Sequence, residues 1–427
     1  MSDAAVTVQP LSRPPDAVVR VPGSKSISNR VALLAALADG RSVLDGVLFS
    51  DDTRYMATAL RALGIAVDAD EAAERLTVDG GGGRWPSAGA ELFVGNAGTA
   101  MRFLVAALCL GHGRYRIDGS ERMRERPIQD LVDALVRLGV AVRSERGTGA
   151  PPVVVEANGL PGGATELAAA RSSQFVSALL QVAPYAARDV TITLSGEIIA
   201  QPYIDMTVAV MGQWGVRVER DGARVYRVAC GQRYRAQRYA VEPDASSAHY
   251  FWAAAALTGG RVRVAGLHRG SLQGDVQFAG LLERMGATVR WEADAITVEG
   301  PAQLGGIDAD LNAFSDTAPT LAALAPFASA PVHIRNVAHL RWQESDRLRA
   351  VATELARLGA RVEERADGLS VWPSPLHAAR IATYEDHRIA MAFALVGLKV
   401  AGVEIADPGC VAKTFPDFFA RLETLRR

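Results

Sequence analysis

The stretch SISNRVALLAALADG at residues 26–40 decides the fold, because the chain repeats its pattern of a short polar cap followed by a helix-length apolar run. Five further copies lie at 98–113, 172–186, 246–260, 316–328 and 386–402. With the starts taken as Ser28, Thr99, Ser173, Ser247, Thr317 and His387, successive starts are 71, 74, 74, 70 and 70 residues apart. Such a period predicts one supersecondary unit used six times. The runs are apolar on every side, which is typical of buried helices.

A second repeat runs out of phase with the first. It combines an amphipathic stretch, a Gly and a short extended stretch, which predicts helix, Gly C-cap and strand. The glycines are Gly64, Gly139, Gly215, Gly286 and Gly359, and the preceding stretches open near Asp52, Asp130, Asp205, Asp275 and Asp346. Hairpin-like pairs follow, as at 66–78 and 361–371. The sixth copy lacks this second half, unless the segment around Val6–Val19 supplies it.

Composition agrees with a globular protein of two domains with three units each. The chain has 427 residues, of which 49% are hydrophobic and 22% charged. Its net charge of -1 argues against a nucleic-acid or membrane-surface partner, since both select for a basic excess. No apolar run reaches the roughly 18 residues that span a bilayer. The start, MSDAAVTVQPLSRPP, does not resemble a signal peptide, so we expect a cytoplasmic protein.

Cysteine and histidine spacing predicts no metal site and no cofactor. Cys109, Cys230 and Cys410 are widely spaced and form neither a zinc signature nor a disulfide framework. Cys410 is a conceivable nucleophile, but a lone Cys is more often a small buried hydrophobe. The run Gly80–Gly83 is not followed by the Lys-Ser or Lys-Thr of a phosphate-binding loop, so we expect an ordinary loop there.

The polar caps of the apolar helices are candidate anion-binding sites. The first cap, PGSKSISNR at 22–30, places two cations and three hydroxyls near a helix start, where unpaired N–H groups and the helix dipole favour oxyanions. Ser and Asn are also ordinary caps, and Lys and Arg are usually solvated. Recurrence favours the ligand interpretation, because the second and third caps offer backbone N–H groups, hydroxyls and an amide, while the loops at 122–127, 344–347 and 386–388 and Lys413 add cations. We therefore expect a polyanionic ligand.

The same strings carry a family resemblance. PGSKSISNR, GNAGTAMRFL, RMRERPIQDL, SSQFVSALL, QPYIDMT, ESDRL, EDHRIAMAFAL and AKTFPDFF, in this order over nearly the whole chain, resemble the 5-enolpyruvylshikimate-3-phosphate synthase family. The resemblance implies an α/β enolpyruvyl transferase fold, an inside-out α/β barrel of two similar domains, each of three βαβαββ units. One domain would span 22–242 and the other 1–21 with 243–427, with a hinge near 21–23 and 242–245 that closes over the substrates.

The implied reaction transfers the enolpyruvyl group of phosphoenolpyruvate to the 5-hydroxyl of shikimate 3-phosphate and releases phosphate, on the route to chorismate and the aromatic amino acids. By resemblance, shikimate 3-phosphate would meet Lys25, Ser26, Arg30, Ser172, Ser173, Gln174, Tyr203 and Asp316. Phosphoenolpyruvate would meet Lys25, Gly98, Arg126, Gln174, Arg347, Arg388 and Lys413. Asp316 resembles the base for the 5-hydroxyl and Glu344 its partner near C3, while Lys25 completes the catalytic set.

Four positions depart from the family pattern. Phe103 stands where Pro is common, which leads us to expect altered sensitivity to glyphosate, an inhibitor that occupies the phosphoenolpyruvate pocket in many members. Ala200 replaces a phosphate-binding Ser, Gln343 replaces a common substrate-contacting Lys, and His339 stands where some members have Asn. These departures bear on how shikimate 3-phosphate is bound.

Two alternatives remain at this point. One is the related enolpyruvyl transferase that acts on UDP-N-acetylglucosamine, whose reactive-Cys loop and Lys-Asn first cap are not recognisable here. The other is a catalytically silent phosphometabolite-binding protein, in view of Ala200 and Gln343. The resemblance favours the shikimate 3-phosphate enzyme, acting as a monomer on its two small-molecule substrates.

Overall fold

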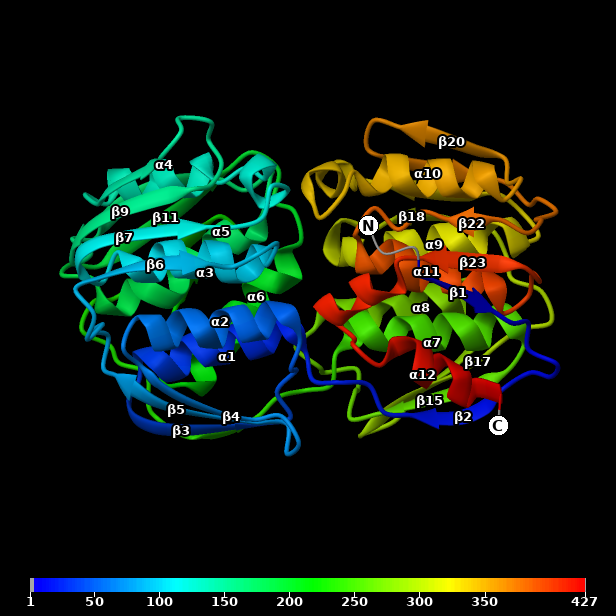
Figure 1. Cartoon of the computed structure of the whole chain (residues 1–427), viewed down its shortest axis with the longest axis horizontal. Helices are drawn as coiled ribbons and strands as arrows, with labels where there is room; N and C mark the ends of the chain where they lie inside the picture. Colours follow the sequence, from blue (N-terminus) through cyan, green and yellow to red (C-terminus); the bar gives the residue numbers. More distant parts are fainter. Residues whose placement is uncertain (1–3, 427) are drawn as a thin grey trace. The chain divides into compact units, whose positions relative to one another are not determined.

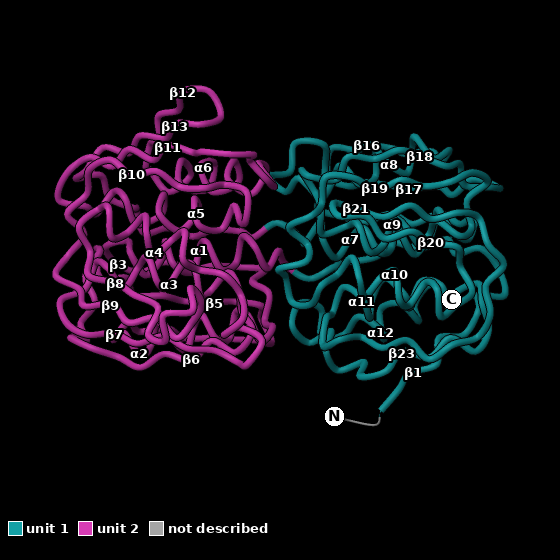
Figure 2. The backbone as a smooth tube through the Cα atoms, turned by 90° about the horizontal axis from the view of Figure 1, so that it is seen from above, with its two compact units in different colours: residues 1–22, 242–427 teal, residues 23–241 magenta. Residues whose placement is uncertain are grey.

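The computed structural model describes residues 4–426 and divides into two compact units. Unit 2 is Gly23–Val241, and unit 1 combines 1–22 with 242–427 (Figure 2). These divisions lie next to the expected boundaries at 22 and 242, while the hinge itself stays a prediction. Within the described residues the strands form six small sheets, three in each unit (Figure 1).

Three of the sheets are built from contiguous βαβαββ units, as predicted. Each has one parallel pair at its edge followed by antiparallel pairs, as in the order β6-β7-β9-β8. The second unit comprises β6 (Gly89–Phe93), α3 (Gly98–Leu108), β7 (His112–Asp118), α4 (Gln129–Arg137), β8 (Ala141–Ser144) and β9 (Val153–Asn158). The third comprises β10 (Gly163–Ala168), α5 (Ser173–Val182), β11 (Val190–Ser195), α6 (Gln201–Gln213), β12 (Glu219–Asp221) and β13 (Val225–Val228). The fifth comprises β18 (Ile307–Asp310), α9 (Ala318–Leu324), β19 (Val332–Arg335), α10 (Arg347–Arg357), β20 (Val362–Arg365) and β21 (Gly368–Val371).

The first and fourth units each take their leading strand from elsewhere in the chain. The first contains α1 (Lys25–Leu37), β3 (Asp39–Asp45), α2 (Asp51–Ala62), β4 (Ala66–Asp70) and β5 (Arg75–Gly81), and β14 (Arg238–Ala240) pairs in parallel with β3. The fourth contains α7 (Ala245–Thr258), β15 (Arg261–Ala265), α8 (Gln277–Arg284), β16 (Thr288–Trp291) and β17 (Ala295–Glu299), and β2 (Asp16–Val19) pairs in parallel with β15. The strand that precedes α1 in the chain thus belongs to unit 1, and the strand that precedes α7 belongs to unit 2.

The sixth unit is completed by the N-terminal segment, which resolves the open question about Val6–Val19. It contains β22 (Arg380–Ile381), α11 (His387–Gly397), β23 (Val403–Ala406) and α12 (Phe418–Glu423). The missing strand is β1 (Ala5–Val8), which pairs antiparallel with β23. Only the first part of the segment serves the sixth unit, because β2 joins the fourth sheet.

The six apolar helices are buried, which confirms the prediction from their composition. In α3, α9 and α11 every residue is buried. These helices pack on one another inside their own unit: α3 against α5 in unit 2, and α9 against α11 in unit 1. Among the described residues, no helix combines the length and apolarity that crossing a membrane requires.

The out-of-phase repeat also forms as predicted, with one exception. All five glycines have a positive φ between 88° and 103°, the conformation that ends a helix and that only Gly adopts without strain. Asp52, Asp130, Asp275 and Asp346 lie at or near the start of a helical segment. Asp205 does not, because α6 already begins at Gln201.

Four predicted starts of apolar helices were misplaced, that of α3 by one residue, since the helix begins at Gly98 and not at Thr99. Both α1 and α7 begin before the predicted Ser28 and Ser247, because Ser24 and Asp244 take the cap position and accept hydrogen bonds from backbone N–H groups of the first turn. Thr317 ends a 3₁₀ segment (Asn312–Thr317), and α9 begins one residue later. For α1 and α7 the cap is therefore an earlier residue than the pattern alone indicated.

Candidate active site

In unit 2, the first cap positions Lys25. The Ser24 hydroxyl accepts a hydrogen bond from the Ile27 N–H at 3.4 Å, which makes Lys25 the first residue of α1. Its Nζ lies 3.6 Å from Oδ2 of Asp52 in the first turn of α2. The Asp52 side chain is 3% exposed, so this ion pair is shielded from solvent and holds the ammonium group against α2.

Arg30 lies further along α1 and is buried among protein acceptors. Its guanidinium donates to the carbonyl oxygens of Ser26 and Tyr203 at 2.8 and 3.0 Å. It also donates to the hydroxyls of Thr207 and Ser177 at 2.8 and 3.4 Å. Burial lowers the Arg30 pKa to about 10, against an opposing effect of Tyr203. Arg30 therefore joins α1 to α5 and α6, and its predicted contact with substrate stays a prediction.

The start of α3 lies under the guanidinium of Arg126. Arg126 donates through Nη1 to the backbone oxygen and the side-chain oxygen of Asn96, at 3.1 and 3.0 Å. A Cβ at Gly98 would lie only 2.6 Å from Arg126 Nη2, which is closer than real Cβ contacts. With no Cβ at Gly98, the guanidinium of the buried Arg126 can lie this close to the helix start. A cation and the backbone N–H groups at the start of a helix are the groups that bind oxyanions in proteins.

The start of α5 adds hydroxyl and amide groups. Ser172 is the N-cap, and its hydroxyl accepts from the Gln174 N–H at 3.2 Å. Ser173 is the first helical residue and is buried. Gln174 Nε2 donates to the Thr99 hydroxyl at 3.3 Å, which joins the starts of α5 and α3. Within unit 2 the second and third predicted caps, at the starts of α3 and α5, are therefore in contact.

In unit 1, Asp316 lies between two arginines. Its Oδ1 is 3.0 Å from Nη1 of Arg347, at the start of α10, and its Oδ2 is 2.5 Å from Nη2 of Arg388, in the first turn of α11. The Asp316 side chain is 25% exposed, whereas those of Arg347 and Arg388 are 2% and 4% exposed. Both carboxylate oxygens of the predicted base are therefore occupied by the cations predicted to bind phosphoenolpyruvate.

Glu344 and Asp386 complete this cluster. Glu344 Oε2 is 2.7 Å from Arg347 Nη2, and its Oε1 is 4.0 Å from Nζ of Lys413. Asp386, which is fully buried, accepts from Arg347 Nε at 2.8 Å and from the Ser345 hydroxyl at 2.9 Å. Its other oxygen accepts from the Arg388 N–H at 3.0 Å.

The cluster thus contains three carboxylates and three cations, with Arg347 at its centre. Burial alone would lower the Arg347 pKa, but the charges of Asp386, Glu344 and Asp316 outweigh it and raise the pKa, so the guanidinium stays charged. Asp386 is held inside the protein, whereas Asp316 keeps some exposure. An incoming oxyanion would therefore compete with Asp316 for the arginines and leave Asp386 as their fixed partner.

The structure shows the contacts or backbone conformation of three residues that depart from the family pattern. His339 Nε2 lies 2.8 Å from the Ser315 hydroxyl, and burial lowers the His339 pKa to about 4, with Asp316 opposing the shift. Phe103 is fully buried, and the Arg30 guanidinium lies 5.2 Å from the centre of its ring. Ala200 has a left-handed backbone with φ of 50° at the start of α6. The expected effect of Phe103 on glyphosate sensitivity stays a prediction.

Two residues of these clusters were missed as site residues in the sequence, Asp52 and Asp386. Each looks like an ordinary acid at a helix start, and nothing local distinguishes it from a cap. Gln343 directly precedes Glu344, after a 3₁₀ turn at Ala338–Trp342. Burial raises the pKa of the Cys410 thiol to about 12, which disfavours the nucleophile hypothesis. No group of three or more metal-ligating side chains is found in residues 4–426.

Comparison with known proteins agrees with this architecture. The family model described as EPSP synthase (3-phosphoshikimate 1-carboxyvinyltransferase) matches residues 12–422. A relative from Nostoc sp. named 3-phosphoshikimate 1-carboxyvinyltransferase is 50% identical over 97% of this chain and 98% of its own. The chloroplastic relative from Solanum lycopersicum with the same name is 48% identical over 95% of this chain and 81% of its own. The structure of EPSP synthase from Acinetobacter baumannii superposes with a TM-score of 0.82 at 25% identity and covers 98% of this chain and 97% of that one, which confirms the predicted fold. The chain belongs to the 5-enolpyruvylshikimate-3-phosphate (EPSP) synthase family.

Proposed function

We propose that this chain is itself a 3-phosphoshikimate 1-carboxyvinyltransferase: it transfers the enolpyruvyl group of phosphoenolpyruvate to the 5-hydroxyl of shikimate 3-phosphate. The observation that carries the proposal is the family match over residues 12–422, together with relatives of that name at about 50% identity. These matches do not favour the UDP-N-acetylglucosamine enzyme or a silent binding protein.

The reaction proceeds by addition and elimination. In the addition, the 5-hydroxyl oxygen forms a bond to C2 of phosphoenolpyruvate, the hydroxyl loses its proton, and C3 gains one. In the elimination, C3 loses a proton, the C2–O bond to phosphate breaks, and inorganic phosphate leaves with the enolpyruvyl ether as the other product. Each step needs a positioned proton acceptor or donor and cations for the phosphate and carboxylate.

We assign the acid–base roles to the carboxylates of unit 1. Asp316 accepts the proton of the 5-hydroxyl, and Glu344 transfers the proton to and from C3. In the structure the two arginines occupy both oxygens of Asp316. Substrate oxyanions that bind Arg347 and Arg388 release the Asp316 carboxylate, so that substrate binding itself makes the base available.

Substrate binding is assigned to the remaining residues. Lys25, Arg126 and Lys413 supply positive charge for the anionic groups, and Lys25 also meets the charge that develops on the departing phosphate. The helix starts contribute backbone N–H groups and side-chain donors. The assigned neutral residues are Ser26, Gly98, Ser172, Ser173, Gln174, Tyr203 and Gln343. The metal-free mechanism expected from the sequence is part of the proposal.

The experiment measures phosphate release from phosphoenolpyruvate with each acceptor. We expect release with shikimate 3-phosphate and none with UDP-N-acetylglucosamine, and we expect Asp316→Asn to slow the release about 10²–10⁴-fold. Release with the second acceptor, or binding of shikimate 3-phosphate without any release, would overturn the assignment. We further propose that the protein is cytoplasmic, because both substrates are highly charged metabolites that do not cross membranes unaided. Independently of this, we propose that it is a monomer. Size-exclusion chromatography with light scattering tests the monomer.

A further inference from the structure

The segment between β22 and α11 contains a turn with an unfavourable backbone conformation (Figure 1). It ends at Asp386, the buried residue that holds Arg347. The Asp386 N–H donates to the Thr383 carbonyl oxygen at 2.9 Å, which closes a four-residue turn. The two central residues, Tyr384 and Glu385, have φ values of 56° and 55°. Positive φ at both central positions is the pattern of a type I′ turn, which Asn, Asp and Gly adopt far more readily than Tyr or Glu.

The Tyr384 side chain explains how this turn is held. Residues other than glycine keep a costly positive φ only where the surrounding structure fixes them, and such positions are common at functional sites. The Tyr384 hydroxyl donates to Oε1 of Glu354, in α10, at 2.7 Å. Burial and the Glu354 carboxylate raise the pKa of Tyr384 to about 12, so the hydroxyl keeps its proton. A contact outside the turn therefore supports a conformation that the turn's own residues disfavour.

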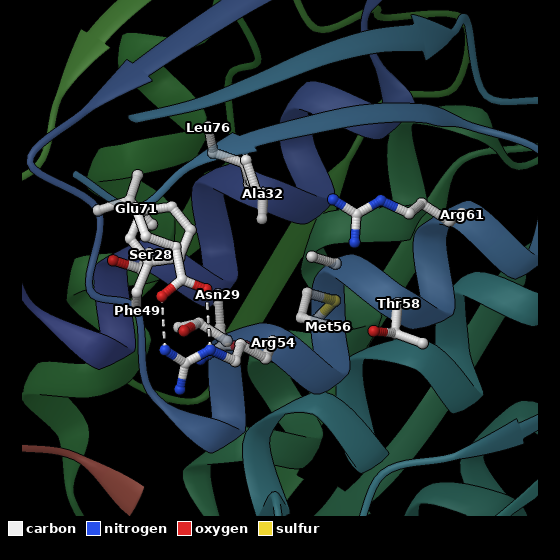
Figure 3. A pocket seen from close by; sticks show the side chains of 14 residues that line it. Ser28, Asn29, Ala32, Phe49, Arg54, Met56, Thr58, Arg61, Glu71 and Leu76 are labelled. Atoms are coloured by element: carbon white, nitrogen blue, oxygen red, sulfur yellow. Dashed lines mark hydrogen bonds and ion pairs between the residues drawn. The ribbon is translucent and has the colours of Figure 1, made fainter. Parts of the chain in front are cut away.

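Glu354 is a buried carboxylate with donors on both oxygens. Its Oε2 accepts from the Ala382 N–H at 3.1 Å and lies 3.2 Å from Nε of Arg357, and its side chain is 0% exposed. The two-point ion pair of Arg54 and Glu71 in unit 2 is different, because these side chains are 46% and 52% exposed (Figure 3). An exposed pair of that kind contributes little, whereas a buried carboxylate is costly to leave without its donors.

The same segment is attached to α10 at two heights. Glu354 and Arg347 lie on the same side of α10, because they are about two helical turns apart. The segment is bonded to Glu354 at Ala382 and to Arg347 at Asp386, whose Oδ2 lies 2.8 Å from Arg347 Nε. These two attachments fix the position of Asp386 along the helix. Asp386 also accepts from the Arg388 N–H, so its position affects both arginines that contact the catalytic carboxylate.

We propose that Tyr384 and Glu354 are positioning residues for phosphoenolpyruvate binding and act through Asp386 on Arg347 and Arg388. The Tyr384–Glu354 hydrogen bond holds the strained turn, and the turn holds Asp386 against the two arginines. Without the hydroxyl the turn relaxes and Asp386 moves away from Arg347. The binding-competent arrangement is then populated for only part of the time, which weakens the apparent affinity in proportion. The effect on substrate binding rests on the proposed function, whereas the hold on the turn does not.

Two variants separate the hydroxyl from the turn, and since Tyr384 is 42% exposed, neither opens a cavity in the core. Tyr384→Phe removes the hydroxyl and keeps the strain. It should raise the KM for phosphoenolpyruvate at least about fivefold, because losing a hydrogen bond to a charged group shifts an equilibrium by about tenfold or more. The double variant Tyr384→Asn with Glu385→Gly also lacks the hydroxyl but supplies residues that the turn favours. Its KM should therefore stay within about twofold of the parent.

The other kinetic constants show whether the effect is specific. In Tyr384→Phe the KM for shikimate 3-phosphate should change less than about twofold, because most residues assigned to that substrate lie in unit 2. The kcat should also change less than about twofold, because saturating phosphoenolpyruvate itself holds the arginines in place. A general loss of structure would instead affect all three constants.

Hydrogen exchange followed by mass spectrometry reports on the turn without any turnover. The amides of Asp386 and Arg388 are hydrogen-bonded in the parent. Peptides that cover 383–388 should exchange about tenfold faster in Tyr384→Phe and at the parent rate in the double variant. A parent that releases no phosphate would contradict the proposed function, and the exchange rates would still decide whether Tyr384 holds the turn.

Tyr115→Phe is the matched control. The Tyr115 hydroxyl, in unit 2, donates to the Ser87 carbonyl oxygen at 2.7 Å, the same distance as in the Tyr384–Glu354 bond. This variant should leave both KM values and the exchange of 383–388 unchanged. Four results would each overturn the proposal: unchanged exchange in Tyr384→Phe, an unchanged KM for phosphoenolpyruvate, equal rises in both KM values, or a double variant as impaired as Tyr384→Phe.

Discussion

Replacing Asp386 by Asn tests whether burial sets the strength of the ion pairs in the unit 1 cluster. Asp386 is fully buried and accepts four hydrogen bonds: two from Arg347, one from the Ser345 hydroxyl and one from the Arg388 N–H. An amide keeps the shape but loses the charge, and whichever way it turns, its NH₂ group faces two donors. The substitution thus removes one partner of a buried ion pair and adds a donor–donor conflict.

The expected loss follows from this burial. Breaking a buried ion pair by removing one partner costs about 3–5 kcal/mol. In a unit of about 200 residues, each kcal/mol lowers Tm by about 2–4 °C, so unit 1 should melt about 6–20 °C lower. The KM for phosphoenolpyruvate should rise more than that for shikimate 3-phosphate, because Asp386 orients Arg347.

A surface ion pair provides the control. Arg335 Nε lies 2.6 Å from Asp308 Oδ1, a shorter distance than any of the Asp386 contacts, but the two side chains are 49% and 56% exposed. Exposed pairs contribute about 0–1 kcal/mol, so Asp308→Asn should lower Tm by less than about 4 °C. Thermal melts followed by circular dichroism measure both variants. Equal shifts in the two variants would refute the reasoning that burial, rather than distance, sets the strength of the Asp386 contacts.

Three other predictions concern single residues. Gly98→Ala places a Cβ 2.6 Å from Arg126 Nη2. It should raise the KM for phosphoenolpyruvate at least about tenfold, with little change in the KM for shikimate 3-phosphate. Equal changes in the two KM values in steady-state assays would contradict this prediction. Asp316→Asn should lower kcat about 10²–10⁴-fold. Phosphoenolpyruvate should bind as tightly or more tightly, because no carboxylate competes with it for the arginines. Weaker binding by calorimetry would contradict the idea that substrate oxyanions replace Asp316 on Arg347 and Arg388. His339 has a folded pKa lowered from 6.5 to about 4, so the unfolded chain takes up its proton first as the pH falls, and stability is lost between those two values. Between pH 7 and pH 5, His339→Asn should therefore lose about 2 kcal/mol less of its free energy of unfolding than the parent, as measured by denaturation. An identical pH dependence in the two proteins would show that His339 is not responsible for the loss.

The local features of the fold were predictable from the sequence because short-range chemistry determines them. Ala-rich runs specify buried helices, and the Gly that follows each amphipathic helix adopts a positive φ. The partners of β1 and β2 were not predictable, because their pairing is set by strands far away in the chain. Two strands within one short segment join two different sheets, and no local pattern distinguishes their destinations.

The candidate site was predictable to a similar depth. Resemblance named the residues with conspicuous chemistry, such as Lys25 and Arg347, from motifs that occur in order along the chain. It did not name Asp386, whose importance lies in which arginine it holds. That information is tertiary, since Asp386 and Arg347 are 39 positions apart and meet only once α10 and α11 have packed.

The borrowed strand β1 has a consequence for synthesis on the ribosome. All of unit 2 is contained in residues 23–241, so it can fold as soon as β14 has emerged. β1 ends at Val8, but its partner β23 begins at Val403. At about 5–20 residues per second, β1 waits about 20–80 s with its backbone groups unpaired. A pause in translation after β14 has emerged would therefore delay unit 1 and leave the folding of unit 2 unaffected.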